Sequence, residues 1–401
     1  MNHDDHRILA RRLDLYHMEE DAPGMIYWHA AGWRIYRILE DFIRDQMARR
    51  GYQEVRSPQL LPKSLWEASG HWEKFGDAMF AVPRPDGRDM ALKPMSCPCH
   101  LQIFNHERRS WRDLPMRICE FGICHRDEPS GSMHGLMRTR GFEQDDAHVI
   151  CMPDQVQGEV ARFVALLKEV YAALGFPSFD VSLSLRPDKR AGSDAEWDLS
   201  EAQLLAAARD CGLEPMLQPG EGAFYGPKLE FALKDMHGRA WQCGTIQLDM
   251  VVPGRLGASY VGADGDAHVP VMLHHAVLGS LGRFIGILLE NSAGRLPFWL
   301  APVQVAVLPI ADAQLDAAKQ VADALRAAGL RPEVFGQAES LQRRLVMMHE
   351  RLIPAQIVIG KREAAAGQVM LKLDGEERAM TVTGAIAQLQ AAMAQSGPLI
   401  S

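Results

Sequence analysis

The sequence has 401 residues and a formal net charge of −8; 47% of its residues are apolar and 23% are charged. These values fit a globular protein with sizeable cores, most simply two domains. They disfavour a protein that coats nucleic acid non-specifically, although a locally basic surface can still bind RNA. No uninterrupted apolar stretch reaches the roughly 18–20 residues of a membrane span, and residues 1–24 lack the apolar core of a signal peptide. The seven cysteines do not form a short secreted framework, so we expect a reduced, cytoplasmic protein.

The first 295 residues carry the signals of helices packed on a mainly antiparallel sheet. Apolar residues recur at helical spacing before Gly51, and two strand-like runs flank a polar, glycine-rich turn between residues 116 and 151. In chain order, the predicted elements are a helix over 33–50, a strand over 52–61 that is broken at Pro58, strands on both sides of 129–135, a helix over 154–174, strands within 220–251, a strand over 269–279 and a helix over 280–291.

The composition changes over residues 294–305, and the order of the predicted elements changes with it. Strands and helices alternate beyond this point, which predicts a small α/β domain with parallel strands. We therefore expect two domains, residues 1–297 and residues 298–401. The predicted elements of the second are a strand over 303–309, an alanine-rich helix over 312–328, a strand over 330–335, a helix over 339–350, strands over 356–360 and 368–373, and a helix over 382–395.

Residues 93–100, "KPMSCPCH", place two cysteines and a histidine close together. Thiolate and imidazole are ligands that Zn²⁺ prefers, and a catalytic zinc site uses three protein ligands and keeps one position open. The Cys-x-Cys-His spacing matches no common structural zinc site. Three interpretations therefore stay open, namely a metal site, buried structural thiols and a redox pair. The candidate ligands along the chain are Cys97, Cys99, His100, His134, His148, His274 and His275.

Several long segments carry a resemblance to one protein family. They are "DHRILARRLDLYHMEEDAPGMIYWHAAGW", "KPMSCPCHLQIFN", "DLPMRICEFGICHRDEPSGSMHGLMRTRGFEQDDAHVI", "EGAFYGPKLEF", "RAWQCGTIQLD" and "VPVMLHHAVLGSLGRFIGIL". In order and content they are similar to bacterial threonyl-tRNA synthetases, and the likeness thins in the C-terminal hundred residues. The resemblance implies an α+β class II synthetase catalytic domain with an antiparallel sheet, followed by a C-terminal α/β anticodon-binding domain. It also implies a homodimer joined through motif 1, which ends at Pro58.

The activity that the resemblance implies is that of a threonine–tRNA ligase. L-Threonine and ATP, with Mg²⁺, form threonyl-adenylate, and the threonyl group then passes to the 3′ end of tRNA. In this family one Zn²⁺ per subunit binds the amino and hydroxyl groups of threonine. An apolar pocket separates threonine from valine by only about 100-fold, so ligation of the hydroxyl should reject valine much more strongly. By motif, the implied zinc ligands are Cys97, His148 and His274, and the implied threonine contacts are Asp146, Gln144 and Tyr225.

The implied ATP contacts fall in motifs 2 and 3. Arg126 matches the arginine that contacts the α-phosphate and the threonine carboxylate, and Arg283 matches the motif 3 arginine beside ATP. In-line attack on the α-phosphorus needs positioned reactants and neutralised charge, which two arginines and Mg²⁺ would supply. The other positions matched to ATP contacts are Glu128, Arg138, Gln242 and Phe142, the last stacking on adenine.

Two further positions concern the transfer of the amino acid. His71 matches a family histidine proposed to help deprotonate the terminal 2′-hydroxyl of tRNA, and Gln247 matches a glutamine near the reacting centre. The other interpretation of His71 is a solvent-facing side chain without a catalytic role.

The sequence departs from the family pattern at both ends and beside the first zinc ligand. It begins at the catalytic core, so we expect no domain that hydrolyses seryl-tRNA and no editing in cis. Where the family usually reads Asn-Cys-Pro-Gly-His, Ser96 and Cys99 replace the asparagine and the glycine. These two changes lie beside Cys97 and can reshape the pocket wall.

The C-terminal departures concern positions where the family contacts RNA. Residues 333–350 keep Arg343 and Arg344 but lose other basic positions, and "LKLDG" at 371–375 gains Asp374. Glu363 does fit an acidic position that can read an anticodon base. Each lost phosphate contact lowers RNA affinity and its salt dependence. The alternative function is therefore a paralogue that activates an amino acid for a carrier protein or small molecule, or that serves as an inhibitor-resistant second copy.

Overall fold

The computed structural model describes residues 4–235, 237–336 and 339–396, which form two compact units. One unit comprises residues 18–26 and 40–287, and the other comprises residues 1–17, 27–39 and 288–401. Within the described ranges, none of the helices combines the length and apolar character needed to cross a membrane.

The unit that contains residues 40–287 is built on an eight-stranded sheet with the strand order β11-β10-β12-β13-β16-β9-β8-β3. Neighbouring strands are antiparallel except for the outer pairs β10–β11 and β3–β8. The predicted antiparallel sheet is therefore confirmed. The strands are β3 (Gln53–Glu54), β8 (Met116–His125), β9 (Gly141–Cys151), β10 (Asp180–Ser184), β11 (Met216–Gln218), β12 (Lys228–Lys234), β13 (Ala240–Asp249) and β16 (Val271–Ala276).

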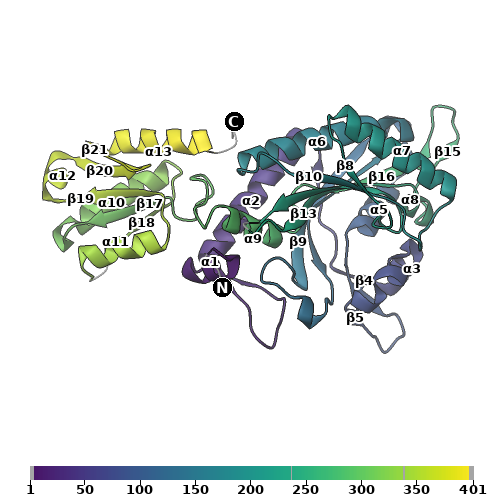
Figure 1. Cartoon of the computed structure of the whole chain (residues 1–401), viewed down its shortest axis with the longest axis horizontal. Helices are drawn as coiled ribbons and strands as arrows, with labels where there is room; N and C mark the ends of the chain where they lie inside the picture. The colour runs from purple at the N-terminus through teal and green to yellow at the C-terminus, as the bar shows by residue number, and fades with distance from the viewer. Residues whose placement is uncertain (1–3, 236, 337–338, 397–401) are drawn as a thin grey trace. The chain divides into compact units, whose positions relative to one another are not determined.

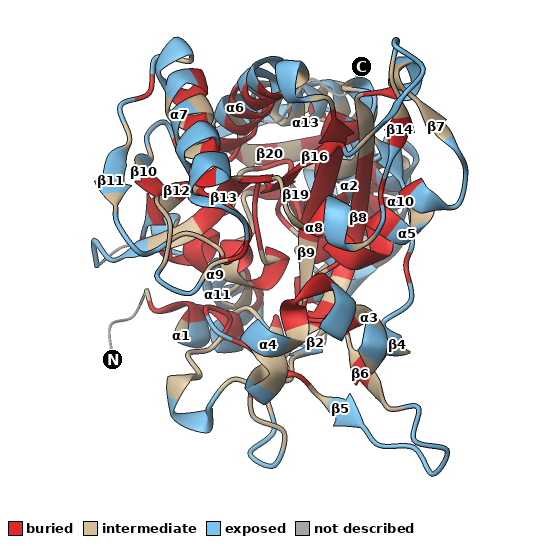
Figure 2. Ribbon diagram, turned by 90° about the vertical axis from the view of Figure 1, so that its right-hand side faces the viewer, coloured by how far each residue is buried: buried red, intermediate tan, exposed pale blue. Residues whose placement is uncertain are grey.

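Both faces of the central strands are covered, which explains why β16 is buried along its whole length (Figure 2). Helices α6 (Val156–Ala173) and α7 (Asp194–Asp210) lie on one face (Figure 1). There Phe163 of α6 packs against Phe231 of β12 and His275 of β16. Helix α5 (Cys97–Asn105) covers the other face with an apolar cluster that includes Leu101 and Phe104. Successive strand residues point to opposite faces, so each central strand serves two different cores.

Shorter elements complete this unit. The predicted helix over 154–174 is confirmed as α6, while the broken strand over 52–61 proves to be two short strands, β3 and β4 (Leu60–Pro62). The remaining elements are the helices α3 (Lys63–Ser69), α4 (His71–Phe75) and α8 (Val252–Arg255), and two three-stranded sheets made of β4, β5 (Ala81–Val82) and β6 (Met90–Leu92), and of β7 (Arg109–Ser110), β14 (Tyr260–Val261) and β15 (Ala267–His268). Helices α2 (Ala30–Arg49) and α9 (Leu281–Asn291) contribute residues to both units.

The other unit contains a five-stranded sheet in the order β18-β17-β19-β20-β21. Its first three strands are parallel, as predicted, but β20 and β21 run antiparallel, so a wholly parallel sheet was wrong. Asp374 and Gly375 form a two-residue hairpin turn with positive φ angles of 52° and 82°, and Asp-Gly is a typical sequence for such a turn. The elements are β17 (Val305–Pro309), α10 (Leu315–Ala327), β18 (Pro332–Val334), α11 (Leu341–Glu350), β19 (Ala355–Ile359), α12 (Lys361–Ala366), β20 (Gln368–Leu373), β21 (Glu376–Thr381) and α13 (Val382–Ser396).

The N-terminal helix α1 (His6–Arg12) belongs to the same unit and begins in a buried polar cluster. His6 Nδ1 lies 2.7 Å from Glu290 Oε1. The carboxylate of Asp5 accepts hydrogen bonds from the backbone N–H and the guanidinium of Arg7, which hold the pKa of Asp5 well below its usual range against the effect of burial. The bonds to Asp5 cap the helix, so this carboxylate has a structural role.

Arg344 on α11 is buried, although the sequence placed it among the candidate RNA contacts. Its guanidinium donates to the carbonyl oxygens of Pro309 (2.7 Å), Phe335 (2.8 Å) and Ile310 (3.3 Å). Arg344 therefore satisfies the backbone at the carboxyl ends of β17 and β18, whereas its neighbour Arg343 is exposed.

We predict that the substitution Arg344→Ala destabilises the C-terminal sheet by roughly 2–4 kcal/mol, because three buried carbonyl groups lose a charged donor. Arg343→Ala should change stability by no more than about 0.5 kcal/mol. Hydrogen exchange of the β17 amides measures the effect locally. Equal protection in the two variants would contradict this role of Arg344.

Candidate active site and metal-ligand cluster

A cavity of about 470 Å³ lies within the unit that contains residues 40–287, lined by residues of α4, β9, β12, β13 and α9 and of several loops. Among the residues that line it, five side chains are basic and two are acidic, although the whole chain carries an excess of negative charge. Such a wall concentrates anions locally regardless of the net charge of the protein. The basic residues are Lys74, Arg126, Arg138, Lys228 and Arg283, and the acidic residues are Glu128 and Glu221.

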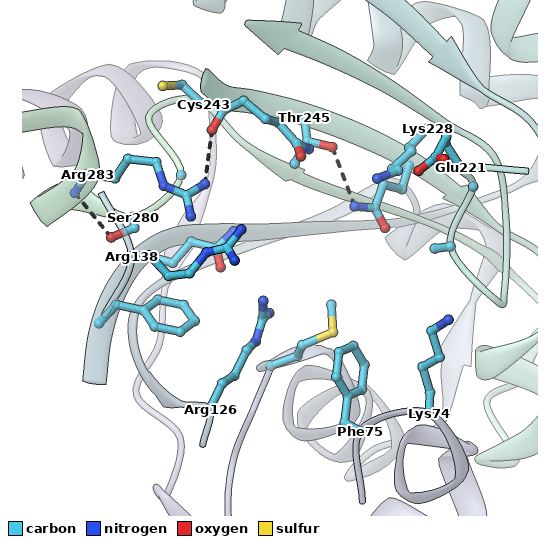
Figure 3. Close-up of a pocket in the computed structure, with 18 of the residues that line it drawn as sticks. Lys74, Phe75, Arg126, Arg138, Glu221, Lys228, Cys243, Thr245, Ser280 and Arg283 are labelled. Atoms are coloured by element: carbon cyan, nitrogen blue, oxygen red, sulfur yellow. Dashed lines mark hydrogen bonds between the residues drawn. The ribbon is translucent and has the colours of Figure 1, made fainter. Parts of the chain in front are cut away.

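Three arginines extend into this cavity from different elements (Figure 3). Arg283 on α9 is held in place by hydrogen bonds from Nε to Met137 O (2.8 Å) and from Nη1 to Gln242 O (3.3 Å). Arg126, just after β8, donates to Pro94 O (3.2 Å). Bonds to backbone carbonyls fix these side chains before any ligand arrives, which is the preorganisation that binding a polyanion requires.

Aromatic rings also lie beside Arg126. The guanidinium of Arg126 lies 5.5 Å from the ring centroid of Phe75 and 5.1 Å from that of Phe142. Cations over aromatic faces are attracted to them. The sequence-predicted residues that line the cavity are Arg126, Glu128, Arg138, Phe142, Gln144, Tyr225, Gln242, Gln247 and Arg283.

The register of the central strands brings distant residues of the chain into one row. His274 on β16 stands opposite His148 on β9, and Gln247 on β13 stands opposite His274 from the other side. Asp146 and Gln144 follow on the same face of β9, because the side-chain period of a strand is two residues. The predicted zinc and threonine residues of β9, β13 and β16 therefore share one face of the sheet.

Cys97, His148 and His274 form a buried cluster whose Sγ and ring nitrogen atoms all lie within 4.8 Å of one another. His148 Nε2 is 3.1 Å from His274 Nδ1, and His274 Nε2 is 2.9 Å from Asp249 Oδ2. A carboxylate oxygen accepts, so Nε2 of His274 donates to Asp249, and in that tautomer Nδ1 turns its lone pair toward the cluster. One thiol and two imidazoles are a donor set that fits Zn²⁺.

Cys97 begins helix α5 and is completely buried. Burial raises the pKa of its thiol well above the usual range, and the nearby carboxylates of Asp146 and Asp249 add to this effect. Burial likewise lowers the pKa of His148 well below its usual value, so its ring is neutral. A buried thiolate needs a cation beside it, and a coordinated dication deprotonates a thiol outright. The chemistry of the three donors thus matches the group that the family implies.

The cluster borders the cavity through Tyr225. The ring of Tyr225 stacks on that of His274, with centroids 4.7 Å apart, and its hydroxyl donates to Gln247 Oε1 at 2.6 Å. Asp146 is buried behind this wall, with Oδ1 3.8 Å from His148 Nε2. A small molecule bound at the cluster would therefore lie next to the arginine-lined space.

His71 is completely buried, so the solvent-facing interpretation of this residue is wrong. Its Nε2 lies 3.2 Å from Cys97 Sγ and its Nδ1 lies 2.9 Å from Ser69 Oγ. Burial, with added effects of His274 and Arg126, lowers the pKa of His71 to about 3. The ring is therefore neutral at physiological pH.

Of the other candidate ligands, His100 contacts His148, whereas three lie elsewhere. His275 points to the α6 face of the sheet, where its Nε2 is 2.7 Å from the hydroxyl of Tyr52. His134 stacks on Trp241. Cys99 packs in an apolar cluster with Trp66, Met79 and Ala91. Ser96 is the N-cap residue of α5 but its side chain makes no capping hydrogen bond. The two cysteines of "KPMSCPCH" thus lie in different clusters, Cys97 with the two histidines and Cys99 with Trp66.

Comparison with known proteins agrees with this geometry. The family profile "tRNA synthetase class II core domain (G, H, P, S and T)" matches residues 80–292, and "Anticodon binding domain" matches residues 304–392. A crystal structure titled as the RNA binding domain of threonyl-tRNA synthetase from Cryptosporidium parvum superposes with a TM-score of 0.93, at 36% identity over 97% of this chain and 98% of that one. The chain belongs to the threonyl-tRNA synthetase family of class II synthetases.

Bacterial relatives are more similar in sequence. The threonine–tRNA ligase of Azoarcus sp. is 53% identical over 92% of this chain, and that of Gluconobacter oxydans is 52% identical over 92%. The chain spans 58% of the Azoarcus protein and 57% of the Gluconobacter protein.

Several residues of this candidate site escaped prediction from the sequence. Lys74, Phe75 and Lys228 line the cavity, and Lys228 pairs with Glu230 on the same strand. Lys74 follows His71 by three positions on the short helix α4, and a charged residue on such a helix gives no sequence signal that separates a cavity wall from a solvated face.

Asp145 was also missed, because it lies between Gln144 and Asp146 but faces away from them. Its carboxylate accepts hydrogen bonds from the backbone N–H groups of Val277 (2.8 Å), Leu278 (2.9 Å) and Gly279 (2.8 Å). These residues form the turn that joins β16 to α9 and hence leads to Arg283. A single buried carboxyl group thus fixes the turn that precedes the helix of Arg283.

We predict that Asp145→Asn lowers the free energy of unfolding by about 1–3 kcal/mol, since an amide cannot accept all three bonds and its own N–H₂ would face other donors. Amide exchange at residues 277–279 should accelerate. Asp180→Asn on β10 is the control, because Asp180 is exposed and pairs with Lys234 at the surface. Unchanged amide protection at residues 277–279 in Asp145→Asn would show that Asp145 does not hold this turn.

Proposed function

We propose that this chain is a threonine–tRNA ligase, which forms threonyl-adenylate from L-threonine and ATP and transfers the threonyl group to the 3′ end of tRNA. The observation that carries the proposal is the buried Cys97, His148 and His274 cluster at the border of an arginine-lined cavity. The names of the bacterial relatives support it. We further propose that the protein is a homodimer, which its mass in solution would test.

For activation, the cavity residues would hold ATP with Mg²⁺. Arg126 would contact the α-phosphate, where charge develops as the threonine carboxylate attacks, and Arg283 would lie along the triphosphate. Arg138, Glu128 and Gln242 would complete the nucleotide contacts, and Phe142 would stack on adenine. Their fixed positions lower the cost of orienting two anions for in-line displacement.

For recognition of threonine, Cys97, His148 and His274 would hold one Zn²⁺ per subunit. When bound, the metal supplies open coordination positions for the amino and hydroxyl groups of the amino acid. Asp146 would accept a hydrogen bond from the bound threonine, and Tyr225 and Gln144 would close the pocket. Gln247 would lie near the reacting centre, where Tyr225 orients its amide.

For transfer, His71 would act at the tRNA terminal 2′-hydroxyl. Burial keeps its imidazole neutral, as a proton acceptor must be. Because its Nε2 lies against Cys97 Sγ, this role requires the ring to exchange the thiol contact for the ribose. His71 is thus positioned by the metal ligand whose cluster selects the amino acid.

We predict that Cys97→Ser abolishes zinc binding and lowers threonine-dependent pyrophosphate exchange by at least about 100-fold, because a hydroxyl is a much poorer zinc ligand than a thiolate. Cys99→Gly is the control and should leave exchange unchanged, since Cys99 lies in the Trp66 cluster. A Cys97→Ser protein with full zinc content and full exchange would sink the assignment.

Discrimination among amino acids gives a second prediction. Serine keeps the amino and hydroxyl groups and lacks one methyl, so its kcat/KM in pyrophosphate exchange should be only about 10–200-fold below that of threonine. Valine loses the hydroxyl ligand and should fall by at least about 10⁴-fold. We propose that these 401 residues release seryl-tRNA without hydrolysing it. Absence of any serine activation would contradict this account of the pocket.

The C-terminal unit favours a second candidate, amino acid activation for an acceptor other than tRNA. The β20–β21 hairpin exposes Asp374, Glu376 and Glu377, and Arg344 is used by backbone carbonyls. Glu363 accepts from Gly360 N at the start of α12. Few basic groups therefore remain at the positions where the family contacts RNA.

We predict that the KM for tRNA rises by less than about 10-fold between 50 and 200 mM salt, because few basic groups are left to contact phosphates. A protein that contacts 6–10 phosphates would lose roughly 10³–10⁵-fold in affinity over the same range. The measurement is aminoacylation of bulk tRNA with threonine at several salt concentrations. Normal pyrophosphate exchange with no transfer to tRNA would favour the second candidate and exclude the first.

A further inference from the structure

A chain of buried polar groups begins at Nδ1 of His148, the ring nitrogen that does not face His274. His148 Nδ1 is 2.7 Å from His100 Nδ1, and His100 Nε2 is 3.2 Å from Glu120 Oε2. Lys93 Nζ is 3.0 Å from Glu120 Oε1 and 2.8 Å from Ser57 Oγ. We call His100, Glu120, Lys93 and Ser57 the buried relay.

The relay places two charged groups where solvent cannot reach them. The side chains of Lys93 and Glu120 are each only 1% exposed. Glu120 also accepts from the backbone N–H (2.9 Å) and hydroxyl (2.7 Å) of Ser57. Burial alone raises the pKa of Glu120, but the bonds from His100 and Ser57 and the charge of Lys93 bring it to about 2. Glu120 is therefore ionised. Apolar residues in place of such a buried ion pair often leave stability unchanged or increase it, so stability alone does not explain the pair.

The assignment of a donor and an acceptor to each hydrogen bond of the relay shows what other role the pair has. A carboxylate only accepts, so His100 donates to Glu120 from Nε2. One of the two Nδ1 atoms must donate across the 2.7 Å contact between the rings. An imidazole that donates from Nε2 accepts at Nδ1, so the proton between the two rings is assigned to Nδ1 of His148. The lone pair of His148 Nε2 is thereby left pointing toward His274 Nδ1, 3.1 Å away.

The tautomer of His274 is set by a single partner, because its Nε2 donates to the carboxylate of Asp249 and its Nδ1 keeps a lone pair. Each histidine of the cluster is thus fixed in the tautomer that turns a lone pair toward the other. Two facing lone pairs repel unless a cation lies between them. The arrangement is costly for an empty core and suited to a metal site.

We propose that His100 and Glu120 are positioning residues that set the tautomer and orientation of His148 and thereby preorganise the metal site, with Lys93 and Ser57 keeping Glu120 ionised. This rests on the zinc site of the proposed function. Partners of a metal-bound histidine typically change metal affinity by about 10–100-fold when they are lost.

The test uses two substitutions at His100 in the full chain, with zinc affinity measured by competition against a chromophoric chelator. His100→Leu removes the acceptor for His148 Nδ1 and should weaken zinc binding by about 10–100-fold. His100→Asn places an amide oxygen near the former Nδ1 and should restore most of the affinity. Equal losses in the two variants, or no loss in His100→Leu, would overturn the proposal.

A second measurement separates positioning from general destabilisation. Bound zinc raises the melting temperature by an amount that depends on its Kd. In His100→Leu this zinc-dependent increment should shrink, and the absorption spectrum of the Co²⁺-loaded protein should shift. A residue that matters only for packing would lower the melting temperature with and without zinc by the same amount, and that result would overturn the proposal.

The double variant Lys93→Met, Glu120→Gln removes the ion pair without changing a group that touches His148. It should also weaken zinc binding by about 10-fold or more, because glutamine can donate to His100 and release the tautomer. Cys99→Gly, next to His100 on α5, is the control and should bind zinc as tightly as the wild type. A wild type that binds no zinc would overturn the metal site itself, whereas tight binding in all variants would overturn this proposal alone.

Discussion

The pairing of β16 with β9 is the constraint on which the rest of the site depends. It sets His274 directly opposite His148, and the strand on the other side of β16 adds Gln247 to the same row. A slip of one residue would turn the whole face over. His275 would then occupy the cluster and His274 would enter the α6 core. The apolar packing of His275 against Phe163 therefore helps to specify the register that assembles the metal-ligand cluster.

The two faces of β9 divide the work between them. Gln144, Asp146 and His148 face the cluster and the cavity, while Asp145 faces the turn before α9 and binds three of its N–H groups. The position of Arg283 is thus tied to the same strand that carries the proposed threonine contacts. The proposed ATP and threonine sites would therefore share a single rigid element, which is how reacting groups can be held at a fixed separation.

The sequence predicted most of the architecture but not the hydrogen-bond contacts within the site. Two strand-like runs around a glycine-rich turn within residues 116–151 predicted β8 and β9, and the helical pattern over 154–174 predicted α6. Spacing alone could not unite Cys97, His148 and His274, because strand register brings them together from three distant segments; the family resemblance named them. The parallel sheet was wrong for β20 and β21, where the Asp374–Gly375 turn was the overlooked signal. His100 was set among possible ligands, but its actual contact is with a ligand, and only the three-dimensional order of donors and acceptors shows that.

The strand order has a consequence for how the chain assembles during synthesis. β16 is the last strand of the large sheet to leave the ribosome, yet it lies at the centre, between β13 and β9. Before β16 is made, β13 and β9 lack the strand that pairs with both of them, and each has an unpaired edge. Pairing of β16 joins them and brings His274 opposite His148. One member of the proposed metal-ligand cluster therefore arrives with the last strand of the sheet, so the cluster can be complete only once the sheet is complete.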